Sequence, residues 1–150
     1  MAEAIRLARE GMRRGDGGPF GAVIVRRGRI VGRGWNRVLS ASDPTAHAEV
    51  EAIRDACARL GTHDLGGCEI FSSCEPCPMC LAAIHWARLD AVHQACTGQD
   101  AASLGFDDTT IAVELAAQPE DRKLPVHRLM RDEGLALFDE WRAMPNAVLY

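Results

Sequence analysis

Two short groups of residues in the middle of the chain carry side chains suited to metal chemistry. Cys77-Pro78-Met79-Cys80 places two thiols three residues apart, and His47-Ala48-Glu49 places an imidazole two residues from a carboxylate. Two thiolates and one imidazole give Zn²⁺ three protein ligands and leave a fourth position for water, which is the arrangement of a catalytic zinc site. The sequence therefore predicts one Zn²⁺ per chain, held by His47, Cys77 and Cys80.

Glu49 is the acid that remains beside these ligands. A carboxylate next to a metal-activated water acts as a general base and proton carrier rather than as a fourth ligand. Prolines precede both groups, Pro44 before His47 and Pro76 before Cys77, which indicates that each group opens a helix. Asp43 is predicted to be the N-cap of the first of these helices, with Pro44 as its first residue. Two helix N-termini directed at one place favour thiolates and a metal-activated water. We predict that Glu49 is the catalytic residue.

Each group taken alone has other interpretations. Cys-x-x-Cys at the start of a helix also occurs in thiol redox proteins. With Cys74 the spacing resembles an iron–sulfur run, or a closed structural zinc site in which Cys74 is the fourth ligand. A His or Glu in a first helical turn often serves the helix alone. Metal content separates these hypotheses, because a redox protein carries no stoichiometric zinc and only a closed site loses zinc on Cys74→Ser.

His-x-Glu followed by Pro-Cys-x-x-Cys is the signature of zinc nucleobase deaminases. The sequence resembles the cytidine deaminase superfamily, and within it the bacterial guanine deaminases, over nearly the whole chain. The zinc motifs are shared with cytosine, tRNA-adenosine and guanosine deaminases, whereas the Gly105–Asp108 turn and Tyr150 are more particular to the guanine branch. The resemblance rests on residues 18–25, Asn36, 43–50, 73–80, 86–88, Ala101, 105–108, 141–142 and Tyr150.

This resemblance implies a set of substrate-binding residues. Asn36 would hydrogen-bond a purine, Phe20 and His47 would sandwich its ring, and Asp108 would accept hydrogen bonds from the N–H groups of the guanine edge. Tyr150 would close the pocket from the partner subunit of a domain-swapped homodimer. Core packing of the aromatic residues and helix capping by Asp108 are the structural alternatives. The full set is Phe20, Asn36, Ala48, Trp86, Asp108 and Tyr150.

The implied reaction belongs to purine catabolism: guanine and water give xanthine and ammonia. Glu49 would take a proton from zinc-bound water and pass it to ring N3, and the hydroxide would attack C2. Glu49 would then protonate the leaving amine. Guanosine, cytosine, adenosine in tRNA or an amino-triazine are alternative substrates. The tail differs from the guanine branch at Pro145 and residues 147–149, in the segment that helps to choose between free base and nucleoside.

The elements that position these residues alternate between helix and strand. Apolar periodicity and turn residues predict helices over 2–14, 44–60, 76–86 and 135–143, and strands over 20–25, 29–35, 68–73, 90–95 and 124–130. The stretch between 96 and 123 shows no regular pattern. We expect an α/β fold of three layers, a mixed sheet with helices on both faces, as in the cytidine deaminase fold. Residues 1–150 are expected to form a single deaminase domain, with about 131–150 exchanged with the partner subunit.

Composition narrows the class of protein. The 150 residues carry a net charge of −4 with 47% hydrophobic residues, which is typical of a globular domain. A sequence pI near 5.7 disfavours a nucleic-acid partner, and no apolar run is long enough to span a membrane. Six cysteines without a secretory signal favour a reducing compartment, the cytoplasm. The expected partners are a small purine substrate and a second copy of the chain.

Overall fold

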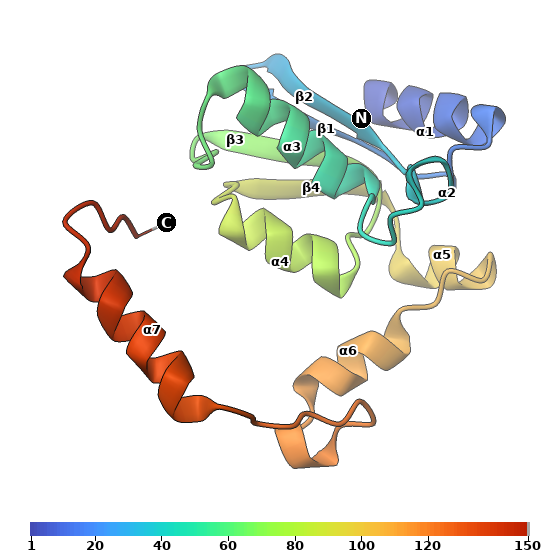
Figure 1. Ribbon diagram of the computed structural model, residues 1–150. Coiled ribbons are helices and arrows are strands. Elements are labelled where there is room, and N and C mark those ends of the chain that lie inside the picture. Colours follow the sequence, from blue (N-terminus) through green and yellow to red (C-terminus); the bar gives the residue numbers. More distant parts are fainter. Residues whose placement is uncertain (150) are drawn as a thin grey trace. The chain divides into compact units, whose positions relative to one another are not determined.

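The computed structural model of the chain describes residues 1–149. It contains two compact units, Met1–Ile111 and Ala112–Tyr150, which are considered separately. The first unit is built on a four-stranded sheet with the order β2-β1-β3-β4 (Figure 1). β1 pairs antiparallel with β2 and β3, whereas β3 and β4 are parallel, so the predicted mixed sheet is confirmed. The strands are β1 (Gly21–Arg26), β2 (Arg29–Trp35), β3 (Cys68–Cys74) and β4 (Ala91–Cys96).

Close backbone contacts at glycines show that helices cover both faces of this sheet. A Cβ at Gly21 would lie 2.2 Å from the carbonyl oxygen of Ala4 in α1 (Ala2–Arg14), and one at Gly34 would lie 2.1 Å from that of Ala48 in α3 (Ala48–Leu60). Gly34 pairs with Ala22, the neighbour of Gly21, and successive strand residues point to opposite faces. The expected three layers are therefore confirmed.

The core lies on the face of the sheet that α3 covers. Ile24 and Ile70 from the strands are fully buried there against the small residues Ala52 and Ala56 of α3. Ile84 of α4 (Pro78–Trp86) closes the same cluster. Alanines on α3 and glycines on β2 allow the helix to approach the sheet closely. This packing fixes the starts of α3 and α4, the two positions that matter for the chemistry.

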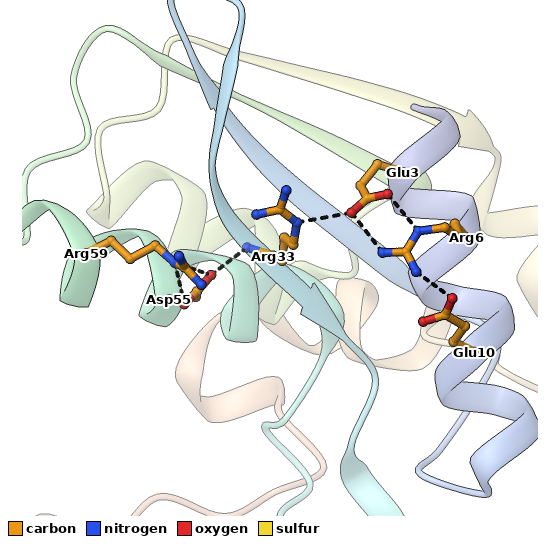
Figure 2. A network of polar contacts seen from close by, with 6 residues as sticks. All are labelled: Glu3, Arg6, Glu10, Arg33, Asp55 and Arg59. Carbon is orange, nitrogen blue, oxygen red and sulfur yellow. Dashed lines mark hydrogen bonds and ion pairs between the residues drawn. The ribbon is translucent and has the colours of Figure 1, made fainter.

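Ion pairs connect both helical layers across the outer strand β2. The Arg33 Nε donates to Glu3 of α1 at 3.0 Å, and its backbone N–H donates to Asp55 of α3 at 2.9 Å. Asp55 also accepts from Arg59 at 2.8 Å. Figure 2 shows this network, which continues along α1 through Arg6 to Glu10. These contacts are accessible to solvent, so each contributes little to the stability of the fold.

The predicted start of α3 is wrong. We expected Asp43 to cap it and Pro44 to open it, but α3 begins at Ala48, with His47 as its N-cap. The Asp43 carboxylate instead accepts hydrogen bonds from the backbone N–H and the hydroxyl of Thr45, at 2.8 and 2.7 Å. A local side-chain turn of this kind competes with helix initiation. Likewise α4 begins at Pro78 rather than at Pro76, with Cys77 as its N-cap.

The later part of the chain departs further from prediction. No strand forms over Leu124–Met130, where Pro125 has no N–H to give to a ladder. The stretch expected to be irregular contains α5 (Gly98–Ser103), α6 (Thr109–Ala116) and a 3₁₀ turn over Pro119–Asp121. The last helix, α7 (Arg131–Ala143), starts four residues before the predicted 135. A four-residue helix, α2 (Val38–Ala41), also precedes α3.

The second unit has no buried core of its own among its described residues. Its large apolar side chains remain accessible to solvent, with Leu129 81% and Phe138 60% exposed. None of the residues from 112 to 149 is buried. No helix in the described part of the chain has the length and apolar character needed to cross a membrane.

Candidate active site

The three predicted metal ligands converge at one point of the first unit. Nδ1 of His47 lies 3.5 Å from Sγ of Cys77 and 3.5 Å from Sγ of Cys80. All three ligand atoms lie within 4.8 Å of one another. Tetrahedral Zn²⁺, with bonds of roughly 2.05 Å to nitrogen and 2.3 Å to sulfur, requires N···S separations of about 3.6 Å. The donor set and its spacing therefore fit zinc without rearrangement.

Helix starts bring these ligands together. His47 and Cys77 are the N-caps of α3 and α4, with extended backbones at φ −74°, ψ 155° and φ −62°, ψ 167°. Cys80 lies one turn into α4 and is fully buried. The prediction that both motifs open helices is thus confirmed, with the helix starts shifted as described above. Unpaired N–H groups at both helix starts favour negative charge on the thiols.

A hydrogen bond between the side chains of Cys77 and Cys80 sets the charge of the two cysteines. This bond to Cys80, together with the contact to His47, lowers the pKa of the Cys77 thiol to about 4. The same bond raises the pKa of the Cys80 thiol. The pair therefore carries one negative charge near neutral pH, and a bound divalent cation takes the place of the remaining proton.

Cys74 is not part of this ligand cluster. Its Sγ contacts the carbonyl oxygen of Thr97 at 3.3 Å, and the group of possible ligands in the described residues contains His47, Cys77 and Cys80 alone. A closed four-ligand site with Cys74 is therefore not supported by the geometry. The three-ligand arrangement leaves an open position, as catalytic zinc requires.

Glu49 lies beside the ligands in a nearly dry position. Its side chain is 5% exposed, and its Oε1 accepts a hydrogen bond of 2.7 Å from the hydroxyl of Ser72. Burial raises the pKa of the Glu49 carboxyl, and the bond from Ser72 opposes that shift. A carboxylate held in this way takes up and releases a proton readily, which suits a general base. Sequence reasoning missed Ser72, which is distant along the chain and carries no motif.

A cavity of ≈ 520 Å³ opens onto these residues. Glu49, His47 and Cys77 form its floor, and all of its lining belongs to the first unit. Six of the residues predicted from sequence line it: Phe20, Asn36, His47, Glu49, Cys77 and Asp108. Apolar walls that were not predicted come from Val38, Leu39, Pro44 and Phe106.

The amide of Asn36 is held in a defined orientation. Its Oδ1 accepts backbone hydrogen bonds from Gly18 at 3.3 Å and Val38 at 3.2 Å. The side-chain NH₂ is therefore the group left to donate into the cavity. A Cβ at Gly17 would lie 2.0 Å from this oxygen, so only glycine fits there without displacing the amide.

The ring of Phe20 stands against a second aromatic ring. Phe106 contacts it edge to face, with ring centroids 5.0 Å apart at 85°. A Cβ at Gly18 would come within 3.0 Å of both rings, so this glycine makes room for the pair. Phe106 lies within the Gly105–Asp108 turn, and the aromatic contact therefore connects that turn with the cavity wall.

The two adjacent aspartates of this turn have different surroundings. The Asp107 carboxylate accepts a 2.9 Å hydrogen bond from the N–H of Thr109, the first residue of α6. Both aspartates line the cavity, and Asp108 is half-buried without a hydrogen bond to other described side chains. The Asp107 carboxylate is therefore engaged with Thr109, whereas the Asp108 carboxylate has no such partner among the described residues.

The structure does not bring every candidate to this cavity. Trp86 is 69% exposed at the end of α4 and lines a separate shallow hollow with Ala82, His85 and Arg88. Ala48 is fully buried at the first position of α3 and is not among the residues that line the cavity. Tyr150 lies outside the described residues.

The fold and this site define a zinc-dependent deaminase. The chain belongs to the cytidine and deoxycytidylate deaminase family, whose zinc-binding region matches residues 1–96. Among individual proteins, it is similar over its full length to a guanine deaminase of Bacillus subtilis (strain 168). The identity is 49% over 150 residues, which is 100% of this chain and 96% of that protein.

Solved structures agree with this similarity. The X-ray structure of a guanine deaminase from Bacillus subtilis superposes with a TM-score of 0.95, covering 99% of this chain and 95% of that chain at 49% identity. A guanine deaminase from Nitrosomonas europaea superposes with a TM-score of 0.68 at 32% identity, covering 95% of this chain and 82% of that chain. A tRNA-specific adenosine deaminase of Aquifex aeolicus (strain VF5) is 44% identical over 89 residues, only 59% of this chain and 58% of that protein.

Proposed function

We propose that this chain catalyses the zinc-dependent hydrolytic deamination of guanine to xanthine and ammonia. One observation carries the choice of guanine: the similarity to the Bacillus subtilis guanine deaminase extends over the whole chain. It therefore includes the turn that bears Asp108, beyond the shared zinc region at residues 1–96. The similarity to the tRNA-specific enzyme of Aquifex aeolicus covers 59% of the chain.

His47, Cys77 and Cys80 hold the metal in this proposal. A zinc ion held by these residues would make a bound water molecule acidic enough to act as the nucleophile at neutral pH. Glu49 accepts a proton from the attacking water and delivers it to ring N3 of guanine. It then takes the remaining proton of the hydroxyl added at C2 and donates it to the departing amine, so ammonia leaves and the C2 carbonyl of xanthine forms. Ser72 keeps the Glu49 carboxylate oriented through these steps.

Three residues of the cavity bind the purine. The Asn36 NH₂ donates to an acceptor of the ring, because its oxygen is already occupied by two backbone donors. The Asp108 carboxylate accepts from the N–H groups of the guanine edge, a role for which it is free and Asp107 is not. Phe20 packs on the ring face opposite His47. A carboxylate in this place disfavours cytosine and adenine, which present fewer N–H donors on the matching edge.

Ammonia release tests the proposal. The unmodified chain is assayed with guanine, guanosine, cytosine, cytidine and adenosine, beside Asp108→Ala and the matched control Asp107→Ala. We expect guanine to be the preferred substrate and Asp108→Ala to lower kcat/KM for guanine about 5- to 150-fold, the cost of about 1–3 kcal/mol for an unpaired N–H. Preference for a nucleoside or for cytosine would refute the proposal.

We propose further that the chain acts as a homodimer in which residues from about 131 to 150 are exchanged. The support is the apolar surface that α7 and the tail leave in water, which includes Leu137, Phe138, Val148 and Leu149, each at least 60% exposed. Burial of each such side chain stabilises an assembly by roughly 1.5–3 kcal/mol. Exchange of an identical segment provides that burial at low cost. Tyr150 would then close the cavity of the partner.

We also propose a reducing compartment, the cytoplasm, as the place where the chain works. All six cysteines are free thiols. The metal site needs two of them as thiolates, and oxidation would remove these ligands.

A further inference from the structure

Glu75 lies in the sequence between the end of β3 at Cys74 and the zinc ligand Cys77. It takes no part in the metal site or in the proposed proton transfers. Its side chain is exposed and its carboxylate lines the cavity. The side chain makes one hydrogen bond in the described part of the chain: Oε2 accepts from the backbone N–H of Gly98 at 2.8 Å. That bond connects the segment bearing Cys77 with the first residue of α5.

Two neighbouring contacts reinforce this connection. The parallel register of β3 and β4 pairs Cys74 with Cys96, and the Glu75 N–H donates to the Cys96 carbonyl at 2.9 Å. The Cys74 thiol contacts the Thr97 carbonyl at 3.3 Å. The segment that carries the zinc ligands is therefore attached to three successive residues that lead into α5: Cys96, Thr97 and Gly98. The Glu75 side chain makes the last of these three contacts.

α5 transmits this attachment to the turn that carries Asp108. A capping box between Thr97 and Asp100 closes its first turn. At its other end, the Phe106 N–H donates to the Ala101 carbonyl at 3.1 Å, and the Gly105 N–H donates to Ala102 at 2.9 Å. The turn is thus a hydrogen-bonded continuation of α5 rather than an independent loop. Movement of Gly98 moves Asp108 relative to the zinc ligands.

We propose that Glu75 is a positioning residue for substrate specificity: it sets the separation between the metal site and the Asp108 carboxylate. Hydrolysis at C2 needs the guanine edge and the reacting carbon at a fixed spacing, and a displacement of about 1 Å costs on the order of 10²-fold in rate in well-positioned sites. This inference rests on the proposed function, because Asp108 is its purine-binding group. Glu75 acts through Gly98 and α5, without contact to the substrate.

The test measures the dissociation constant of guanine by equilibrium dialysis in the catalytically silent Glu49→Gln background, together with zinc content. Glu75→Ala is expected to weaken guanine binding about three- to tenfold, the equivalent of one solvent-accessible hydrogen bond, with zinc unchanged at one ion per chain. Glu75→Gln keeps an acceptor for Gly98 and should restore most of the affinity. Glu69→Ala is the matched control, since Glu69 is an exposed acid of β3 that pairs with His93 instead.

A double-mutant cycle separates positioning from general destabilisation. With Asp108→Ala already present, Glu75→Ala should change guanine affinity less than twofold. Three results would each overturn the inference: additive effects of the two substitutions on guanine affinity, loss of zinc in Glu75→Ala, or unchanged guanine affinity in Glu75→Ala of a chain that deaminates guanine. A chain that does not deaminate guanine would instead refute the proposed function, so the two failures are distinct.

Discussion

Gly17 provides a sensitive test of how the purine-binding amide is oriented. A Cβ added at this position would lie 2.0 Å from Oδ1 of Asn36. The oxygen must therefore move by about 1 Å or more, since a Cβ essentially never lies closer than 3.0 Å to another heavy atom outside its own chain neighbours. Its bonds from Gly18 and Val38, at 3.3 and 3.2 Å, cannot survive that displacement.

The consequence of Gly17→Ala falls on the donor side of the amide. Once the oxygen is displaced, the Asn36 NH₂ no longer points at the ring acceptor. Leaving that substrate group unpaired in a dry cavity costs about 1–3 kcal/mol, or about 5- to 150-fold in kcat/KM. Zinc content should not change, because the metal ligands lie on α3 and α4.

The assay compares kcat/KM for guanine in Gly17→Ala with Gly66→Ala, a loop glycine outside the cavity whose added Cβ meets only the end of the Asp64 side chain. A second comparison places Gly17→Ala in an Asn36→Ala background, where no amide remains to be displaced. We expect a large loss in the first case and less than a twofold effect in the second. Retained activity in Gly17→Ala, or an equal loss without the Asn36 amide, would refute the role given to this residue.

Four further outcomes are expected. Cys80→Ala should lower bound zinc well below one ion per chain by metal analysis, and full retention of zinc would remove Cys80 from the ligand set. Glu49→Gln should bind zinc and guanine yet lose about 10²- to 10⁴-fold in turnover or more; a loss below tenfold would assign proton transfer to another group. Deletion of residues 146–150 should keep zinc but abolish most turnover, and mixing this chain with full-length Glu49→Gln should restore activity; heterodimers without activity would contradict the exchange. Hydrogen bonds from Arg6 and then Arg33 lower the pKa of Glu3 from 4.5 to about 2. The Tm difference between the unmodified chain and Glu3→Gln should therefore be largest above pH 4.5 and shrink as the pH falls toward 2. A Tm difference that does not change with pH would show that the charge of Glu3 is not involved.

The metal site was predictable because its residue types and spacing are local. Cys77 and Cys80 lie on one face of a first helical turn at any start within a residue or two, so misplacing the start of α4 did not affect the ligand set. His47 was found for the same reason, although Asp43 rather than His47 was expected to cap α3. Zinc chemistry therefore followed from two short motifs.

Residues that support the site from a distance were not predictable in this way. Ser72 reaches Glu49 across 23 positions of sequence, and Gly17 matters only because Asn36 folds onto it. Trp86 has the residue type of a purine-stacking group, yet its place at the last turn of α4 directs it away from the cavity. Such roles depend on tertiary packing, which local patterns do not encode.

The C-terminal third illustrates a different limit. Apolar residues over 124–130 favoured a strand by composition, but Pro125 has no N–H to give to a ladder, and the segment forms no strand in the described structure. The exposed apolar side chains of α7 give the same indication: within one chain, nothing in the second unit buries them. Sequence patterns report which surfaces need burial without reporting which copy of the chain supplies it.

A competition assay tests the central claim most directly. The zinc-loaded protein is incubated with guanine, guanosine, adenosine, cytosine and cytidine at equal concentrations, and the products are separated by chromatography, with Glu49→Gln run in parallel. We predict that xanthine forms first and in excess, with one ammonia released per xanthine, and that Glu49→Gln with full zinc forms almost none. Inosine, uracil, uridine or xanthosine as the main product, or equal xanthine formation by Glu49→Gln, would contradict the assignment.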